Sequence, residues 1–161
     1  TGIGERFGER NYGSFTYEET IRTFFLFISS GIQKNRASNT LRATVDIFPT
    51  ILDLAKIELE FDRPGKSFSK YLLKDENELK ERSYTFSETG AVHGPWPSPD
   101  KSNVFCVKSS THKLMYLKTP NEWLFFDLQN DPYETSNIFT GNLEIEKKMK
   151  EKLIGWINRE D

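Results

Sequence analysis

The pattern of hydrophobic and polar positions changes about half-way along the chain. Before residue 80, the apolar residues gather in one continuous run and one helical stripe, with polar loops between them. After residue 80, four short β-type runs follow one another, separated by turn-rich stretches, and the chain then continues into a long amphipathic segment. This change predicts two parts, residues 1–80 and residues 81–161.

The first part is predicted to be an incomplete edge of an α/β domain. Residues 21–29 are apolar almost throughout, which is typical of a strand buried on both faces of a sheet. One strand cannot form a domain, so this part needs sheet neighbours that the chain does not supply. We therefore expect residues 21–29 to be prone to association and to mediate self-association of the chain.

A helix is predicted over residues 44–56, with Thr44 as its cap. Pro49 lies inside this run and cannot donate a backbone hydrogen bond, so the first turn is expected to be separate or kinked. Apolar residues recur at three- and four-residue spacing and give the helix one apolar face. That face consists of Val45, Phe48, Ile51, Leu52 and Ala55.

The second part is predicted to be a small α+β subdomain. Several short strands joined by turns indicate a four-stranded antiparallel sheet. The strands are expected at residues 83–88, 103–108, 113–118 and 122–128. Residues 142–159 read as an amphipathic helix that covers one face of this sheet. Its apolar side consists of Ile145, Met149, Leu153, Trp156 and Ile157.

Composition narrows the class of protein. The 161 residues are 36% hydrophobic and 14% aromatic with a net charge of −2, which is typical of a globular protein. The charges show no basic face, so no nucleic-acid partner is predicted. The longest apolar run, residues 24–28, is far shorter than the roughly 20 residues of a membrane span.

The single Cys106 is expected to be a buried thiol. The chain begins at Thr1 and shows no targeting segment, so the sequence does not decide between a cytoplasmic and a cell-envelope location.

Three runs of sequence together resemble the sulfatases of the alkaline-phosphatase superfamily. Residues 8–13 (GERNYG) and 17–22 (YEETIR) resemble the family's GE.G.G and YEE.IRVP stretch. Residues 44–55 (TVDIFPTILDLA) are similar to VDI.PTILDLAG. Residues 122–128 and 131–137 (DPYETSN) resemble the ELYDL and DP.E..N signature, and 113–116 (KLMY) resembles the KLI strand before it. Their shared order over most of the chain makes the resemblance specific.

The resemblance implies the chemistry of sulfate ester hydrolysis. Sulfatases use a formylglycine nucleophile made from the Cys or Ser of a CxPxR motif, and a divalent cation, typically calcium, bound by Asp, Asn or His. The cation offsets the charge on the departing sulfate, and oxygen ligands suit calcium. No CxPxR occurs in this sequence. We therefore expect calcium in the whole enzyme, and neither a catalytic residue nor a metal ligand in this chain, which would be inactive alone.

Four residues are candidates for substrate binding. Arg10 would contact an anion, or would pair with a nearby carboxylate in its own loop. Ser14 would donate a hydrogen bond beside it. His93 and Trp96 lie in a loop where Trp could stack on a sugar ring, or where the loop is packed and His93 solvated. The family often carries Lys or His just before the Tyr-Glu-Glu segment, and this sequence does not.

The leading hypothesis is that the chain is the C-terminal portion of a sulfuric ester hydrolase acting on a sulfated small molecule or glycan. A fragment of a phosphodiesterase or phosphoglycerol-transferase-type relative on the same fold is one alternative. A stand-alone glycan- or protein-binding module is the other.

Overall fold

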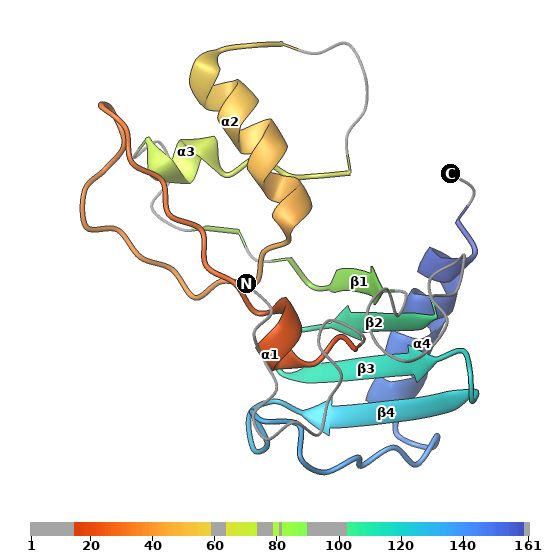
Figure 1. Cartoon of the computed structure of the whole chain (residues 1–161). Helices are drawn as coiled ribbons and strands as arrows, with labels where there is room; N and C mark the ends of the chain where they lie inside the picture. Colours follow the sequence, from red (N-terminus) through yellow and green to blue (C-terminus); the bar gives the residue numbers. More distant parts are fainter. Residues whose placement is uncertain (1–14, 59–63, 74–78, 81, 90–102, 160–161) are drawn as a thin grey trace, which may run out of the picture. The chain divides into compact units, whose positions relative to one another are not determined.

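A computed structural model describes residues 15–58, 64–73, 79–80, 82–89 and 103–159 (Figure 1). The contacts divide the chain into two compact units. We call Thr1–Phe24 with Phe86–Asp161 the sheet unit, and Phe25–Thr85 the helical unit. Among the described residues, no helix is both long and apolar enough to cross a membrane.

The sheet unit is built on a four-stranded sheet in the order β1-β2-β3-β4 (Figure 1). Strand β3 runs antiparallel to both β2 and β4. The strands are β1 (Thr85–Thr89), β2 (Val104–Lys108), β3 (His112–Leu117) and β4 (Glu122–Asp127). Each strand begins and ends within two residues of its predicted bounds, so the prediction of a four-stranded antiparallel sheet is confirmed.

Helix α4 (Glu144–Ile157) covers one face of this sheet, as predicted. It packs against β2 and β3, and Met149 and Leu153 on its inner side are fully buried. The Glu146 carboxylate accepts the backbone N–H groups of Thr140 at 2.9 Å and Leu143 at 3.2 Å. The bond from Leu143, the residue that caps the helix, fixes the start of α4, and the bond from Thr140 ties the preceding turn to it.

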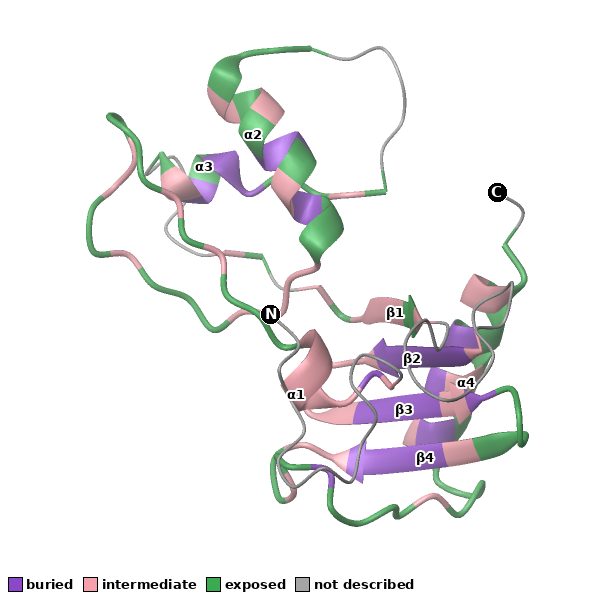
Figure 2. Cartoon of the chain, in the orientation of Figure 1, coloured by how far each residue is buried: buried purple, intermediate pink, exposed green. Residues whose placement is uncertain are grey.

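The opposite face of the sheet is covered by residues 15–21, which include the short helix α1 (Glu18–Ile21). Side chains from three strands form the buried core on this face. Figure 2 shows that much of β2, β3 and β4 is buried. They are Val104, Cys106, Met115, Leu117, Leu124 and Phe126, with Phe15, Tyr17, Ile21 and Leu128 packed against them. Cys106 is 1% exposed, which confirms the predicted buried thiol.

The helical unit contains a short 3-10 helix η1 (Thr44–Asp46), helix α2 (Ile47–Ala55) and helix α3 (Ser69–Leu72). The first turn of the predicted helix is therefore separate, as expected from Pro49. Pro49 is the third residue of α2, where a backbone N–H has no partner inside the helix. The proline is tolerated there because it removes a donor that the helix does not use.

Two features of the predicted helix differ in the structure. Thr44 does not cap it, because the backbone N–H of Ala43 is bonded to the Asp46 carboxylate at 3.1 Å. The predicted apolar face is also not the buried one. The buried residues are Asp46, Pro49 and Thr50, whereas Val45, Phe48 and Ile51 are about half exposed. Buried hydrogen bonds, described below, decide which side of this helix faces inward.

The predicted strand at residues 21–29 is absent, and this prediction was wrong for the described structure. Phe24, Leu26 and Ile28 are 77%, 73% and 86% exposed. The rings of Phe25 and Phe27 lie 6.5 Å and 5.4 Å from the ring of Phe68. Phe68 covers one side of the run, and no strand in the described residues pairs with it. Self-association through this run stays a prediction.

Candidate functional site

The four predicted substrate-binding residues lie outside the described residues. Arg10 and Ser14 fall within residues 1–14, and His93 and Trp96 within residues 90–102. Their roles therefore stay predictions. In the part of the chain that the structure describes, no three His, Cys, Asp or Glu residues gather in a group that would hold a metal ion.

Two buried ion-pair centres lie under the sulfatase-like motifs. The Asp46 centre consists of Asp46, Arg82, Thr50 and the backbone groups around them, and it lies in the helical unit. The Lys113 centre consists of Lys113, Lys108, Glu18 and Glu134, and it lies in the sheet unit.

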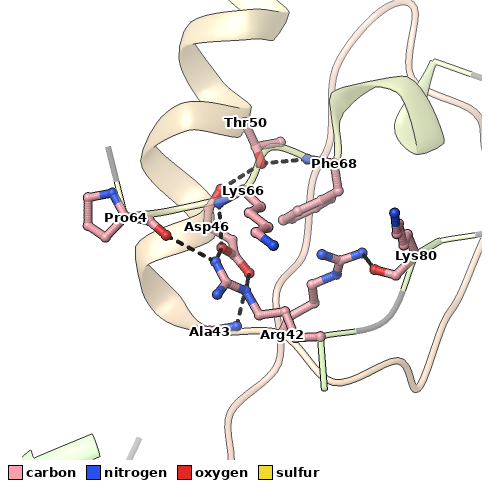
Figure 3. Close-up of polar contacts among 9 residues, drawn as sticks. Arg42, Ala43, Asp46, Thr50, Pro64, Lys66, Phe68 and Lys80 are labelled. Carbon is pink, nitrogen blue, oxygen red and sulfur yellow. Dashed lines mark hydrogen bonds and ion pairs between the residues drawn. The ribbon is translucent and has the colours of Figure 1, made fainter. Parts of the chain in front are cut away.

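Asp46 joins three separate stretches of the helical unit through its carboxylate (Figure 3). Oδ2 accepts the Ala43 N–H and the Nε–H of Arg82, the latter at 2.9 Å. Oδ1 accepts the Lys66 N–H at 2.8 Å and forms the second contact of the ion pair with Nη2 of Arg82. The side chain of Asp46 is fully buried, so every one of these donors replaces water.

The ion pair and the backbone donors keep Asp46 ionised. Burial alone would raise the pKa of Asp46, but hydrogen bonds from Arg82, Lys66 and Ala43 outweigh it and hold the pKa below its ordinary value. Asp46 is therefore a negative charge whose acceptor sites are directed at groups of its own chain.

The neighbouring residues of this motif also bind the chain to itself. The Thr50 hydroxyl donates to the Asp46 carbonyl oxygen at 2.6 Å and accepts the Phe68 N–H at 3.2 Å. Gly65 lies so close to η1 that a Cβ on it would be 2.0 Å from the carbonyl oxygen of Val45. The loop before Phe68 therefore requires glycine at this approach.

Lys113 is the cation at the centre of the second network. Its side chain is fully buried beneath residues 15–21. Nζ lies 2.7 Å from Glu18 Oε1 and 2.7 Å from Glu134 Oε1, and it donates to the carbonyl oxygen of Thr16 at 2.9 Å. One strand residue thus meets both the Tyr-Glu-Glu stretch and the Asp-Pro-Tyr-Glu stretch.

Two further contacts close the network. Glu18 Oε2 lies 2.6 Å from Nζ of Lys108 on β2, and Glu134 Oε2 accepts the backbone N–H of Glu18 at 2.6 Å. Two ammonium groups therefore face two carboxylates. Burial would raise the pKa of Glu18, but Lys113 and Lys108 outweigh it and lower that pKa. Burial raises the pKa of Glu134, and its contacts with Lys113 and the Glu18 N–H do not fully offset this.

The rest of the DPYETSN motif organises the turn after β4. Asp131 accepts the backbone N–H groups of Thr135 at 3.0 Å and Ser136 at 2.9 Å. Asn137 accepts the Phe125 N–H at 2.9 Å and donates to the Trp123 carbonyl oxygen at 3.2 Å. Because β4 is the last strand of the sheet, Asn137 satisfies backbone groups that the edge would leave without partners.

The sequence reasoning did not identify Lys108, Lys113 and Arg82 as partners of the motif carboxylates. For Lys113 the sequence does contain a signal. In β3, Lys113 and Met115 point to the same face because side chains alternate along a strand. A lysine on the apolar side of a predicted strand needs a buried counter-ion. Arg82 has no comparable signal, because it lies 36 residues from Asp46.

Comparison with known proteins identifies the family. Residues 8–159 match the family model described as N-sulphoglucosamine sulphohydrolase, C-terminal. The chain belongs to the sulfatase family. The resemblance in the three motifs is therefore confirmed over nearly the whole chain.

Individual sulfatases are similar to this chain over most of its length. Arylsulfatase K of Bos taurus is 29% identical, with 91% of this chain and 27% of the relative covered. N-acetylglucosamine-6-O-sulfatase of Bacteroides thetaiotaomicron is 30% identical, with 85% and 24% covered. A solved 2-O GAG sulfatase superposes with a TM-score of 0.62 at 25% identity, with 81% and 28% covered. The sulfatase chain thus spans about a quarter of the length of the relatives it matches.

Proposed function

We propose that the sulfatase chain is the C-terminal part of a sulfuric ester hydrolase that acts on a sulfated glycan or small molecule. The observation that carries the proposal is the family match across residues 8–159. Relatives that share this stretch include an N-acetylglucosamine-6-O-sulfatase and a 2-O GAG sulfatase, both named for sulfated sugars. The proposed substrate class follows from these relatives.

The cation of such an enzyme, calcium by resemblance, would be held by residues outside this chain. Bound there, it would offset negative charge that develops on the departing sulfate. The described residues fit this division, because Asp46, Glu18 and Glu134 are engaged with partners within the chain. We infer that the described residues position the site rather than perform the chemistry.

We also propose that residues 1–80 are the C-terminal edge of an α/β domain and that residues 81–161 form its C-terminal subdomain, with residues 15–21 packed on the sheet of that subdomain. Two exposed apolar groups support the first assignment, since exposed apolar surface favours burial against another element. They are Phe24, Leu26 and Ile28 in one group, and Val45, Phe48 and Ile51 in the other. Arg10, Ser14, His93 and Trp96 are proposed to contact the substrate.

The test is hydrolysis by the full-length protein. Sulfated monosaccharides and matched phosphate esters are offered separately, and released sulfate and phosphate are measured with and without a calcium chelator. We expect sulfate release that the chelator abolishes, and no hydrolysis by the 161-residue chain. Phosphate release without sulfate release would replace the proposal with the phosphoester alternative. Glycan binding by the isolated chain, with an inactive full-length protein, would favour the binding module.

The substrate contacts are tested in the same assay. Replacing Arg10 by Ala or Trp96 by Ala is expected to raise KM for the sulfated sugar, because binding contacts are lost. The Lys118→Met variant is the control, since Lys118 is exposed at the end of β3. Unchanged kinetics in both substrate-contact variants would reject these residue assignments while leaving the reaction class intact.

A further inference from the structure

Residues 15–21 are attached to the sheet by charge as well as by apolar packing. The segment lies across the face formed by Cys106, Met115 and Phe126. Thr16 at its start is 2% exposed, so the segment lies flat on the sheet. Its polar attachments run to three elements, which are β2, β3 and the turn after β4.

Lys113 makes the central attachment. The Lys113 ammonium group has three close oxygen partners, one reached by a hydrogen bond and two by ion pairs. Two of these belong to residues 15–21, namely the Thr16 carbonyl oxygen at 2.9 Å and Glu18 Oε1 at 2.7 Å. The third is Glu134 Oε1 at 2.7 Å. If the segment lifts away, the buried cation loses two of its three acceptors, which is costly in an apolar surrounding.

Glu18 and Glu134 complete the attachment. The Glu18 carboxylate bridges Lys113 and Lys108, and its backbone N–H donates to Glu134 at 2.6 Å. Residue 18 is thereby held through both its side chain and its backbone. The segment has little freedom to slide along the sheet, because a shift by one residue would turn the Glu18 side chain away from both lysines.

We propose that Lys113 is a positioning residue, which fixes residues 15–21 and so the point from which the preceding substrate-binding stretch extends. This inference rests on the proposed function. In the sequence, Ser14 and Arg10 precede Glu18 by four and eight residues, so an anchored Glu18 fixes the end of the chain segment that carries both.

The anchor is tested by hydrogen exchange in the full-length protein. Lys113→Met removes the cation but keeps an apolar side chain of similar length. Amides in residues 16–22 are expected to exchange on the order of 10²-fold faster, from the cost of breaking a buried ion pair. The amides of β2 and β3 are expected to keep their wild-type rates. Lys118→Met, at the exposed residue directly after β3, is the control and should change neither set.

A double variant removes the ambiguity of an unpaired buried charge. Lys113→Met with Glu134→Gln leaves no uncompensated carboxylate at that point, and Glu18 keeps Lys108. The sheet should fold, yet residues 16–22 should still exchange about tenfold or more faster than in the wild type, because Thr16 and Glu18 have lost their shared donor. The anchor would be overturned if residues 16–22 of the double variant exchanged at the wild-type rate. It would also be overturned if the exchange rates of β2 and β3 rose as much as those of residues 16–22.

The positioning role is tested in the full-length protein with a sulfated monosaccharide. In the double variant kcat/KM is expected to fall about tenfold, in step with the faster exchange at residues 16–22. Unchanged kcat/KM despite faster exchange would overturn the positioning role. If the wild-type protein releases no sulfate, the proposed function fails, the positioning role fails with it, and exchange still decides the anchor. The two failures are therefore distinguishable.

Discussion

Replacing Asp46 with Asn should open the helical unit while leaving the sheet unit intact. The substitution keeps the shape of the side chain but removes its charge, and it places an NH2 group among donors. Asp46 loses the ion pair with Arg82 and at least one of the backbone bonds to Ala43 and Lys66. The donors of Arg82, Ala43 and Lys66 then lack a good acceptor while they remain buried.

The magnitude follows from the geometry. Breaking a buried ion pair by removing one partner costs roughly 3–5 kcal/mol. The Arg82 side chain is 16% exposed, so water reaches part of it and the lower end applies. We expect a loss of about 3 kcal/mol, which corresponds to about a 10²-fold larger open population. The backbone amides of Ala43 and Lys66 report this directly, because both donate to Asp46.

The assay is hydrogen exchange followed by mass spectrometry on peptides that contain Ala43 and Lys66. Asp53→Asn is the matched control, since Asp53 is an exposed residue of the same helix α2, and it should shift stability by under about 0.5 kcal/mol. A rise of less than tenfold at Lys66 would refute the view that Asp46 holds the unit together. A comparable rise in the strands of the sheet unit would refute its local action.

The pH dependence supplies a second readout for the same residue. The pKa of Asp46 is lowered in the folded state, so its contribution is present above the unfolded pKa of about 3.9 and is lost as the pH falls through the folded pKa. In the wild type, the protection of the Lys66 amide relative to its intrinsic exchange rate should therefore fall on acidification below about pH 4. In the Asp46→Asn variant, the stability of the helical unit should not show this loss on acidification.

Three further predictions concern other contacts. Gly65→Ala should destabilise the helical unit by about 3 kcal/mol or more because a Cβ would lie 2.0 Å from a backbone oxygen, whereas Gly155→Ala, in an open position on α4, should stabilise by about 0.5–1 kcal/mol, both measured by exchange. Asn137→Ala should cost about 1 kcal/mol in urea unfolding followed by tryptophan fluorescence, because water can reach part of this site, and an unchanged midpoint would contradict its role at the β4 edge. Glu134 has a raised folded pKa, so its stabilising contribution is present below about pH 4.5 and is lost as the pH rises through that pKa. In Glu134→Gln, the unfolding free energy should not decrease over this pH range. If the unfolding free energies of Glu134→Gln and the wild type change in parallel with pH, Glu134 is not the source of the decrease.

The sheet unit was predictable because its pattern is local. The short apolar runs of β2, β3 and β4 and the apolar stripe of α4 are properties of consecutive residues, and antiparallel neighbours need short turns. The charge centres depend on residues far apart in the chain. Lys113 meets Glu18 across 95 positions of sequence, and nothing near either residue specifies the other.

The helical unit shows where periodicity misleads. The stripe of Val45, Phe48 and Ile51 predicts an inward face, yet Asp46 and Thr50 are the buried side chains. Their hydrogen bonds to Lys66 and Phe68 fix the helix in this orientation. Turning it to bury the apolar stripe would leave a carboxylate and backbone donors without partners, and that cost exceeds the gain from a few half-exposed side chains.

The motif carboxylates bear on where substrate specificity resides in a sulfatase of this kind. Asp46 and Asp131 accept backbone N–H groups of their own unit, and Glu18 and Glu134 face Lys108 and Lys113. A carboxylate held in this way gains nothing from a sulfate, which it would repel. The motifs that identify the family therefore hold its scaffold. We propose that discrimination between sulfated substrates comes from residues other than these four carboxylates, so the first specificity variants belong at Arg10, Ser14, His93 and Trp96.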